Sequence, residues 1–430
     1  MRRVVFKLVD FIKGSPIQNE LEDLSSFGYA NYDSKEFLSF QEARLRKIIT
    51  YAKHNVAFYK NLSVTLSELP VLNKLHLRNN LSDHISDEFE VKRLKEVRTS
   101  GSTGLPFKVY QSKLKVNRNS ADTIKFGELG GFNFGTPLAY FKIWNNINYK
   151  SPWVQTIQNI IPVDVLNLSD QRITNLINEF NLRANLSFLG YSSALEIIAA
   201  SVRRCGLDVK SKVNSIITMS EGIDLNGRKL IQSVFNCPVY ARYSNVENGI
   251  IAQQISMQSD RYLINSSSYF VEILDWDVDF AAPNGRIGRI VITDYFNTGM
   301  PMIRYDTGDI GAKVVINDKE GVKEYLVDVG GRKMDVIYNT AGELISSFII
   351  TNGMWNYSEL IQYQFIQLSK KKYKFKLIVD KVFNRETDLI NEFKTYLGDD
   401  AVIDVEYANE IPVLASGKRR KVVNLMQNIE

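Results

Sequence analysis

The feature that most constrains the fold is an alternation of amphipathic helical segments with short apolar runs between residues 138 and 240. The apolar runs are rich in β-branched side chains and cover Leu138–Ile143, Ser215–Thr218 and Pro238–Tyr240. Two helical segments lie between them. One follows Ser169, a good N-cap, and places Ile173, Ile177 and Phe180 on one face; the other covers Ala194–Cys205 and stops at Gly206. This alternation predicts an α/β domain with a largely parallel sheet.

The pattern changes twice further along the chain. From about Arg261, three strands separated by turns predict a β-rich subdomain: Tyr262–Asn265, Tyr269–Leu274 and Ile287–Asp294. After Gly330-Gly331, two strands, a helix and a further strand predict a small α+β unit: Tyr363–Leu368, Tyr373–Val379, residues 385–397 and Val402–Tyr407. We therefore expect an α/β fold with a large N-terminal domain, residues 1–333, and a small α+β domain, residues 334–430.

Composition excludes several classes of protein. The 53 basic and 48 acidic side chains leave a net charge of +5, too balanced to argue for a nucleic-acid partner. Two cysteines and three histidines without paired spacing give neither a disulfide framework nor a zinc site. No apolar run approaches the roughly 18 residues of a membrane helix. We expect a cytoplasmic protein, and its oligomeric state stays open.

The N-terminal segment Met1–Lys13 leaves two interpretations open. Lys7 and Asp10 interrupt its apolar residues and it has no small-residue cleavage site, so it is a poor signal peptide. It either packs on the protein or forms a basic amphipathic helix at a membrane surface.

The run Thr-Ser-Gly-Ser-Thr-Gly-Leu-Pro, residues 99–106, has the composition of a phosphate-binding loop. Glycine lets the backbone approach an anion, and the hydroxyl side chains add donors beside the exposed amides. The run matches neither the Walker spacing nor the G-x-G-x-x-G spacing, because Leu105 stands where the Walker lysine would be. It predicts a nucleotide site of another kind, and an ordinary polar turn is the alternative.

Five further motifs follow this loop in a fixed order. They are Ser220-Glu221-Gly222, the segment Tyr243–Gly249 with Glu247, the segment Met302–Asp309, the segment Asp328–Asp335 with Arg332, and the segment Leu414–Arg420 with Lys418. An aromatic ring at the end of a strand stacks on a purine, and a carboxylate four residues later binds a cation that bridges phosphates. Each motif alone has an ordinary explanation as a turn or a solvated end. Their order requires a common explanation.

In this order the motifs resemble the adenylate-forming superfamily, which includes acyl-CoA synthetases, peptide-synthetase adenylation domains and luciferases. The branch that the chain resembles most is the phenylacetate–CoA ligase-like branch with its capsular polysaccharide biosynthesis members. That similarity also rests on Tyr51–Tyr59, Leu69–Lys74 and Gly190–Leu195. The resemblance extends from about Tyr51 to Lys421.

The resemblance implies activation of a carboxylic acid by ATP, through an acyl-adenylate with release of pyrophosphate, followed by transfer to coenzyme A. It implies that the outer phosphates are held by Thr99, Ser100, Gly101, Ser102, Thr103 and Gly104. Glu221 would border the base, Tyr243 would pack against adenine, and Glu247 would bind Mg²⁺. Asp309 and Arg332 would contact the ribose, and Lys418 would reach the carboxylate and the α-phosphate.

Two departures and two alternatives accompany this interpretation. Met334 stands at the hinge where many members carry Asp or Lys, and Phe107 follows the loop proline where lysine is common. The acceptor is coenzyme A or, as in the capsular members, an amine or hydroxyl of a sugar-linked precursor. A relative that binds ATP or AMP without chemistry is the other alternative. Tyr191 and Trp144 are candidate walls of a pocket for an aromatic or apolar acid, or else part of the core.

Overall fold

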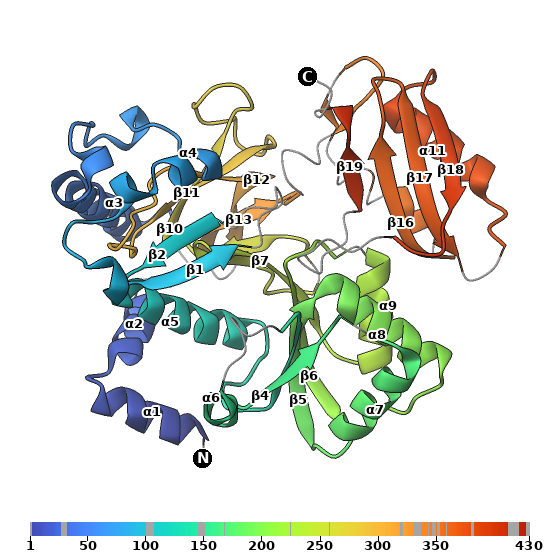
Figure 1. Cartoon of the computed structure of the whole chain (residues 1–430), viewed down its shortest axis with the longest axis horizontal. Helices are drawn as coiled ribbons and strands as arrows, with labels where there is room; N and C mark the ends of the chain where they lie inside the picture. Colours follow the sequence, from blue (N-terminus) through green and yellow to red (C-terminus); the bar gives the residue numbers. More distant parts are fainter. Residues whose placement is uncertain are drawn as a thin grey trace.

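Parallel strands form one half of a large central sheet (Figure 1). In spatial order they are β4 (Ile160–Asp164), β3 (Leu138–Lys142), β5 (Asn185–Tyr191), β6 (Lys212–Met219) and β7 (Val239–Asn245). Three helices pack on one face of this half: α7 (Asp170–Phe180), α8 (Ser192–Arg204) and α9 (Leu225–Phe235). The predicted α/β alternation is confirmed, and Ser169 caps α7 by accepting a hydrogen bond from the Arg172 amide.

The other half of the same sheet is antiparallel. It continues from β7 through β8 (Gly249–Gln253), β9 (Tyr262–Ile264), β13 (Gly321–Val327), β12 (Tyr305–Asp318), β11 (Gly288–Asp294) and β10 (Tyr269–Leu274). The chain reverses direction between β7 and β8, and these two strands pair antiparallel. The parallel sheet predicted for residues 138–240 and the β-rich region predicted from about Arg261 are both present, but they form one continuous sheet.

The structure is a computed structural model. It describes residues 2–26, 32–99, 107–144, 151–166, 168–223, 225–257, 259–318, 321–330, 337–342, 344–345, 350, 353–357, 359–379, 382–411 and 421–426. None of the helices in these ranges is long and apolar enough to cross a membrane.

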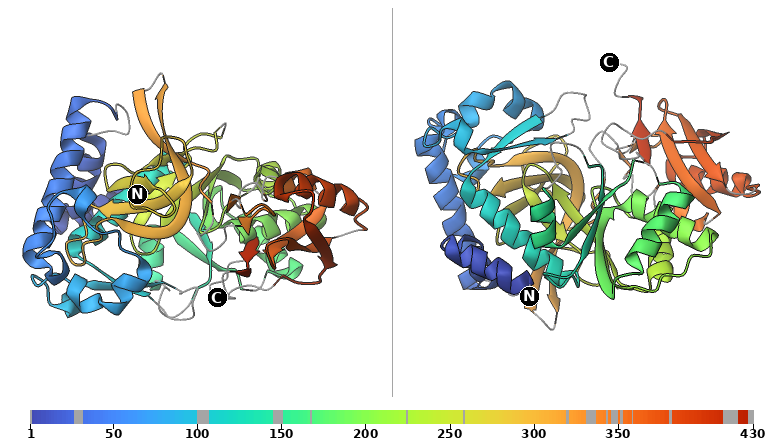
Figure 2. Two further views of the ribbon diagram at one scale, coloured as in Figure 1. Left: turned by 90° about the horizontal axis from the view of Figure 1, so that it is seen from above. Right: turned by 60° about the horizontal axis from the view of Figure 1, so that its bottom comes forward.

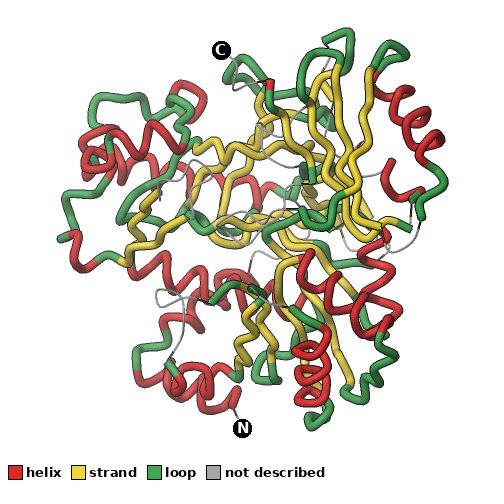
Figure 3. Tube along the Cα trace, turned by 45° about the vertical axis from the view of Figure 1, so that its right-hand side comes forward, coloured by secondary structure: helices red, strands yellow, loops and turns green. Residues whose placement is uncertain are grey.

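Helices and one hairpin from the first part of the chain cover the antiparallel half (Figures 2 and 3). The longer helices are α1 (Arg2–Ile12), α2 (Pro16–Ser26), α3 (Lys35–Asn55) and α5 (Lys113–Leu129). The short helix α6 (Pro152–Gln158) lies instead beside β4, at the edge of the parallel half, and contacts α1. Short helical turns lie at η1 (Ala57–Tyr59), η2 (Leu66–Glu68), α4 (Lys74–Asn79), η3 (Leu81–His84) and η4 (Val91–Arg93). The hairpin pairs β1 (Lys95–Thr99) with β2 (Phe107–Gln111).

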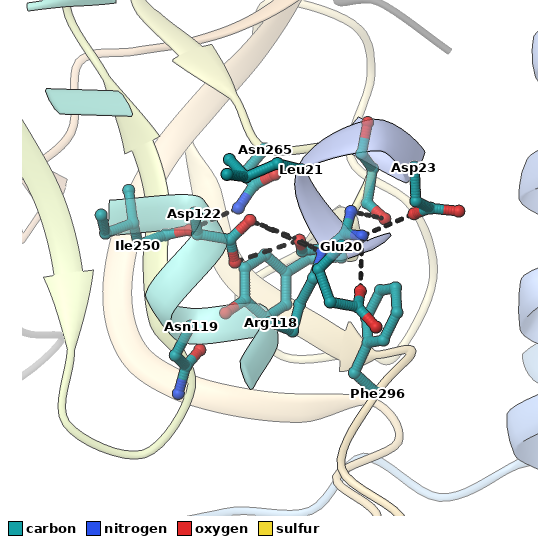
Figure 4. Close-up of polar contacts among 12 residues, drawn as sticks. Glu20, Leu21, Asp23, Arg118, Asn119, Asp122, Ile250, Asn265 and Phe296 are labelled. Atoms are coloured by element: carbon teal, nitrogen blue, oxygen red, sulfur yellow. Dashed lines mark hydrogen bonds and ion pairs between the residues drawn. The ribbon is translucent and has the colours of Figure 1, made fainter. Parts of the chain in front are cut away.

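Arg118 of α5 fixes helix α2 against this half of the molecule (Figure 4). Its fully buried guanidinium contacts Asp122 of its own helix at 3.6 Å and pairs with Glu20 and Asp23 of α2 at 3.1 and 2.5 Å. It also lies 4.1 Å from the centroid of the Phe296 ring. Because each charge has a partner, burying this cluster is compatible with a stable fold.

The small domain is a four-stranded sheet with one helix packed on it, at one end of the molecule (Figure 2). Its order is β18 (Val402–Tyr407), β17 (Lys372–Val379), β16 (Leu360–Gln367) and β19 (Val422–Asn424), and the helix is α11 (Glu386–Leu397). A two-stranded ribbon, β14 (Ile337–Tyr338) with β15 (Leu344–Ile345), and the turn η6 (Met354–Asn356) precede it. The α+β class of this domain is confirmed. The boundary expected at 333/334 falls outside the described residues and stays a prediction.

Candidate active site

The hairpin β1–β2 positions the predicted phosphate loop. Thr99 ends β1 and pairs in register with Phe107, which starts β2. Residues Ser100, Gly101, Ser102, Thr103 and Gly104 lie outside the described residues, but both ends of their loop are fixed by this pairing. Phe107 is buried and its ring lies 5.7 Å from Lys74 Nζ. The residue that directly follows the loop therefore lies close to Lys74.

Glu247 lies where the hairpin meets two other segments. Its side chain is only 4% exposed, and its Oε1 is 2.6 Å from Lys74 Nζ. The Tyr305 hydroxyl donates a hydrogen bond to the same carboxylate at 3.3 Å, and Gln111 Nε2 of β2 donates to the Glu247 carbonyl at 3.2 Å. The predicted metal ligand is thus buried, and a cation already contacts it.

Backbone pairing brings Lys74 to this point. Leu72 donates its amide to the Arg304 carbonyl at 2.9 Å, and the Asp306 amide donates to the Leu72 carbonyl at 2.8 Å. Asn73 then caps α4, so that Lys74 is the first residue of that helix. Sequence reasoning used Leu69–Lys74 for the branch resemblance but assigned Lys74 no role, because no local spacing links it to Glu247.

Arg304 holds the segment 69–74 in place. It adopts φ of 49°, an uncommon conformation for a side-chain-bearing residue. Its buried guanidinium donates to the Leu69 carbonyl at 2.9 Å and pairs with Glu272 at 3.2 Å. This contact joins the motif 302–309 to the segment 69–74.

Tyr243 and Asp309 are in direct contact. The Tyr243 hydroxyl donates to Asp309 Oδ2 at 2.9 Å and lies 3.3 Å from Thr307 Oγ1. Thr307 Oγ1 accepts from the Asp309 amide at 3.1 Å, so the turn holds the carboxylate in place. Burial, together with the neighbouring Asp309 charge, raises the pKa of Tyr243 well above its ordinary value. The residues expected at the base and at the ribose therefore lie side by side.

Glu221 has a partner on helix α8. Its Oε2 accepts from the Ser193 amide at 3.0 Å, and its carbonyl accepts from the Ser192 hydroxyl at 3.0 Å. The carboxylate thus contacts an amide in the first turn of α8, where negative charge is favourable. Ile223, two residues after Glu221, lines a cavity of about 500 Å³. Tyr262 and Asp328 are among the other residues that line it.

The described residues contain no group of three His, Cys, Asp or Glu side chains placed to bind one metal ion. Magnesium needs only one or two protein carboxylates when phosphates and water supply its other ligands. Glu247 supplies one such carboxylate, and a Mg²⁺ ion bound there would compete with Lys74 for it.

Arg332, Met334 and Lys418 fall outside the described residues, so their predicted roles stay predictions. Lys421, three residues after Lys418, lies in the small domain with its Nζ 3.9 Å from Glu196 Oε1 of α8. This contact brings the chain that follows Lys418 against the large domain.

The candidate walls of the acid pocket lie on the sheet face opposite α7 and α8. Trp144 packs edge-on against Tyr140, with ring centroids 5.4 Å apart, and Lys142 Nζ lies 4.1 Å from the Trp144 ring centroid. Burial, and after it the charge of Glu221, raises the pKa of Tyr191. The cationic side chain of Lys142 therefore lies over an aromatic ring at this face.

Comparison with known proteins was made for the sequence and for the structure. Residues 337–425 match the family model of the CapK C-terminal domain. Protein CapK of Staphylococcus aureus is 22% identical over 431 residues, covering 91% of this chain and 90% of that protein.

Among solved structures, 2-hydroxyisobutyryl-CoA ligase in the postadenylation state with 2-HIB-AMP superposes with a TM-score of 0.73 at 16% identity, covering 93% of this chain and 92% of that one. The same ligase with 2-HIB-AMP and CoA in the thioesterification state gives 0.57 at 17% identity, covering 90% and 89%. The amide bond synthetase McbA from Marinactinospora thermotolerans gives 0.56 at 16% identity, covering 77% and 68%.

Proposed function

We propose that this chain, which has the fold of the adenylate-forming ligases and a C-terminal domain similar to that of CapK, activates a carboxylic acid with ATP. The products of the first step are an acyl-adenylate and pyrophosphate, and in the second step the acyl group passes to coenzyme A. The observation that carries this proposal is the convergence of Glu247, the Tyr243–Asp309 pair and the base of the 99–106 loop. No short-range pattern explains why these distant segments meet.

The described residues suit the first step. Asp309, whose carboxylate accepts from Tyr243 and whose amide donates to Thr307, would accept the ribose hydroxyls. Lys74 places a positive charge at the base of the loop that would hold the outer phosphates. A Mg²⁺ ion bound at Glu247 would neutralise charge on the departing pyrophosphate. Fixed charges of this kind stabilise a transition state in which negative charge spreads over phosphate oxygens.

Two residues of the proposed site belong to the region around the small domain. We place Lys418 at the attacking carboxylate and the α-phosphate, because a compact charge on a flexible stem suits a residue that must enter and leave. We place Arg332 at the ribose. Rotation of the small domain about Met334 would then withdraw Lys418 before the acceptor arrives.

A second acceptor is favoured by a specific observation. The matches to CapK and to its C-terminal domain point toward surface polysaccharide synthesis, where an amine or hydroxyl of a sugar-linked precursor would take the acyl group. A site of this fold is not restricted to thiols in the solved structures, since McbA is an amide bond synthetase. We propose a cytoplasmic location whichever acceptor is used, because ATP and coenzyme A are supplied there.

Pyrophosphate exchange tests the proposal. Purified protein with MgATP, labelled pyrophosphate and a panel of acids should incorporate label into ATP in an acid-dependent manner, and Glu247→Gln should abolish it. Adding coenzyme A and seeking a thioester by mass spectrometry distinguishes the acceptors. Nucleotide binding without exchange for any acid would instead identify a binding protein.

A further inference from the structure

One face of the sheet carries a buried guanidinium that the proposed first step does not use. In the register of the parallel strands Tyr191 lies beside Met219, Met219 beside Arg242, and Arg242 beside Gln253 of β8. Paired residues of neighbouring strands point to the same face of a sheet. Tyr140 of β3 reaches this row, with its hydroxyl 3.9 Å from Met219 Sδ.

Arg242 has one neutral partner. Its Nε donates to Gln253 Oε1 at 2.8 Å, and Gln253 Nε2 donates to the Phe126 carbonyl at 2.7 Å, which fixes the orientation of that amide. Within the described part of the chain, no carboxylate pairs with Arg242, although the residue is only 8% exposed. Burial lowers the pKa of Arg242 to about 10. A buried charge without a counter-charge destabilises a fold, so its presence requires a reason.

The position of Arg242 supplies that reason. It directly precedes Tyr243, whose hydroxyl contacts Asp309. Tyr191, in the same row, directly precedes Ser192 in the segment expected to line the acid pocket. Side chains alternate between faces along a strand, so Arg242 and Tyr243 point to opposite faces of β7. The guanidinium therefore lies one residue from the nucleotide site, on the face that carries the candidate pocket walls.

We propose that Arg242 binds a second carboxylate of the substrate, an inference that rests on the proposed function. The activated acid would then be a dicarboxylic acid. A guanidinium donates two parallel hydrogen bonds to a carboxylate, a geometry that gives strength and orientation. The Tyr140 hydroxyl adds a donor, since its sulfur partner is a weak acceptor. This replaces the expectation of an apolar or aromatic acid with that of an acid charged at both ends.

Matched acids test this inference. Pyrophosphate exchange is measured with pairs of equal length, such as butanoate with butanedioate and pentanoate with pentanedioate. Wild type should prefer the dicarboxylate in kcat/KM, and Arg242→Met should reduce that preference about 100-fold, mainly through KM. Arg242→Lys should restore part of it. Because Arg242→Met removes a buried charge that no carboxylate of the described residues pairs with, its melting temperature should be equal to or higher than that of wild type.

Three results would overturn the inference. They are a wild-type preference for monocarboxylates, an unchanged preference in Arg242→Met, and a lowered melting temperature with both acids affected equally, which indicates a structural role. Binding separates this inference from the proposed function. If no acid supports exchange, a dicarboxylate that stabilises wild type but not Arg242→Met in thermal unfolding still supports the site, and equal stabilisation refutes it.

A different observation, independent of the active site, concerns helix α1. Most of its apolar side chains face away from the protein: Val4, Leu8, Phe11 and Ile12 are 68, 58, 72 and 75% exposed, whereas Phe6 packs against Phe134. Its inward side carries Asp10, which is buried and accepts the amides of the first turn of α2, at Ile17 and Gln18. A helix on a protein normally packs its apolar face inward, so this orientation is inverted.

Helix α6 adds exposed apolar side chains next to α1. It contacts α1 and lies beside it (Figure 1), and its Trp153 is 80% exposed, with Val154 and Ile157 partly exposed. The exposed charges of α1 are basic, Arg3 and Lys7, and the exposed Lys13 directly follows the helix; Arg3 also lies 3.4 Å from Glu128 of α5. We call this set of α1 and α6 side chains the α1–α6 surface.

We propose that the α1–α6 surface binds the headgroup region of an anionic lipid bilayer. Exposed apolar side chains beside lysine and arginine, with a tryptophan at the edge, match the chemistry of that region. An ordinary protein partner would not require every exposed charge of the helix to be positive. The helix would lie in the plane of the surface.

Vesicle co-sedimentation tests this second inference with the full chain. Vesicles of 70% phosphatidylcholine and 30% phosphatidylglycerol should retain the protein, and retention should fall with salt and on pure phosphatidylcholine. Phe11→Glu should reduce the partition coefficient about tenfold or more. Val382→Glu, an equivalent change of an 85% exposed residue in the small domain, should leave it unchanged.

Sedimentation by analytical ultracentrifugation completes this test. A monomer that binds anionic vesicles supports the inference. A dimer that Phe11→Glu dissociates, or an absence of binding to anionic vesicles, overturns it.

Discussion

At the scale of single residues, Glu247 and Lys74 form the contact on which the site depends. Their 2.6 Å ion pair lies between the base of the phosphate-loop hairpin and Tyr305. Neither the spacing nor the composition of the sequence links position 74 to position 247. The pair forms only because Leu72 bonds to the backbone on both sides of Tyr305.

We predict that Lys74→Met lowers kcat/KM for ATP about 10- to 100-fold while the apparent affinity for Mg²⁺ rises, because Glu247 loses a competing cation. The fall in kcat/KM is expected because Lys74 would neutralise phosphate charge at the base of the loop. Steady-state pyrophosphate release at varied ATP and Mg²⁺ measures both quantities. Lys376→Met, a change of a lysine on the small domain's sheet, is the control and should leave them unchanged. Equal kinetics in the two variants would remove Lys74 from the site.

His84 gives a prediction for pH. It is fully buried against Phe58, with ring centroids 4.3 Å apart, and within the described residues neither of its ring nitrogens has a hydrogen-bond partner. Burial, and then the proximity of His76, lowers its pKa from 6.5 to about 4. Between these values the unfolded chain takes up a proton that the folded chain does not, so stability should fall as the pH drops from 6.5 to 4.

Thermal unfolding across that pH range measures this effect. His84→Leu should make the melting temperature less dependent on pH between 6.5 and 4, and the exposed His54, changed to Gln, should not. A His84→Leu profile parallel to that of wild type would show that another group titrates.

At the scale of elements, local patterns predicted most helices and strands of the two domains. Tyr373, Phe375 and Leu377 alternate in sequence and all point into the core of the small domain. Two features were beyond local patterns. The joining of both halves of the large sheet through β7 and β8 depends on long-range pairing. The packing of α2 depends on Arg118, which lies 98 positions after Glu20 and 95 positions after Asp23 in the sequence.

The cluster around Arg118 makes the second point testable. Arg118→Met should destabilise the fold by about 3–5 kcal/mol, because Asp122 would stay buried without its cation. The double variant Arg118→Met/Asp122→Leu should recover part of that loss, since both charges are then removed. Urea unfolding measures the free energies. A single variant within about 0.5 kcal/mol of wild type would mean that α2 is held by other contacts.

At the scale of the whole molecule, the two domains meet where Lys421 approaches Glu196. The order of helical and strand patterns in the sequence predicted a large α/β domain followed by a small α+β domain. It did not predict the arrangement of the domains, since no motif encodes how a hinge is set.

Lys418→Ala should separate the two half-reactions. We predict loss of pyrophosphate exchange by about 10²-fold or more, with transfer from a supplied acyl-adenylate to the acceptor retained. Rapid-quench assays of each half-reaction measure this, and Arg420→Ala, two residues away, is the control. Equal loss in both half-reactions would place Lys418 in a static role and argue against rotation about Met334.

The central claim is that the acid attacks the α-phosphate of ATP. It is tested most directly by supplying an acid of the panel with both carboxylate oxygens labelled with ¹⁸O, together with MgATP and the acceptor, and analysing the nucleotide by mass spectrometry. The account predicts AMP carrying one ¹⁸O atom, since the carboxylate oxygen stays on the phosphorus when the acyl group leaves. Formation of ADP with the label in inorganic phosphate would show attack at the γ-phosphate and contradict it.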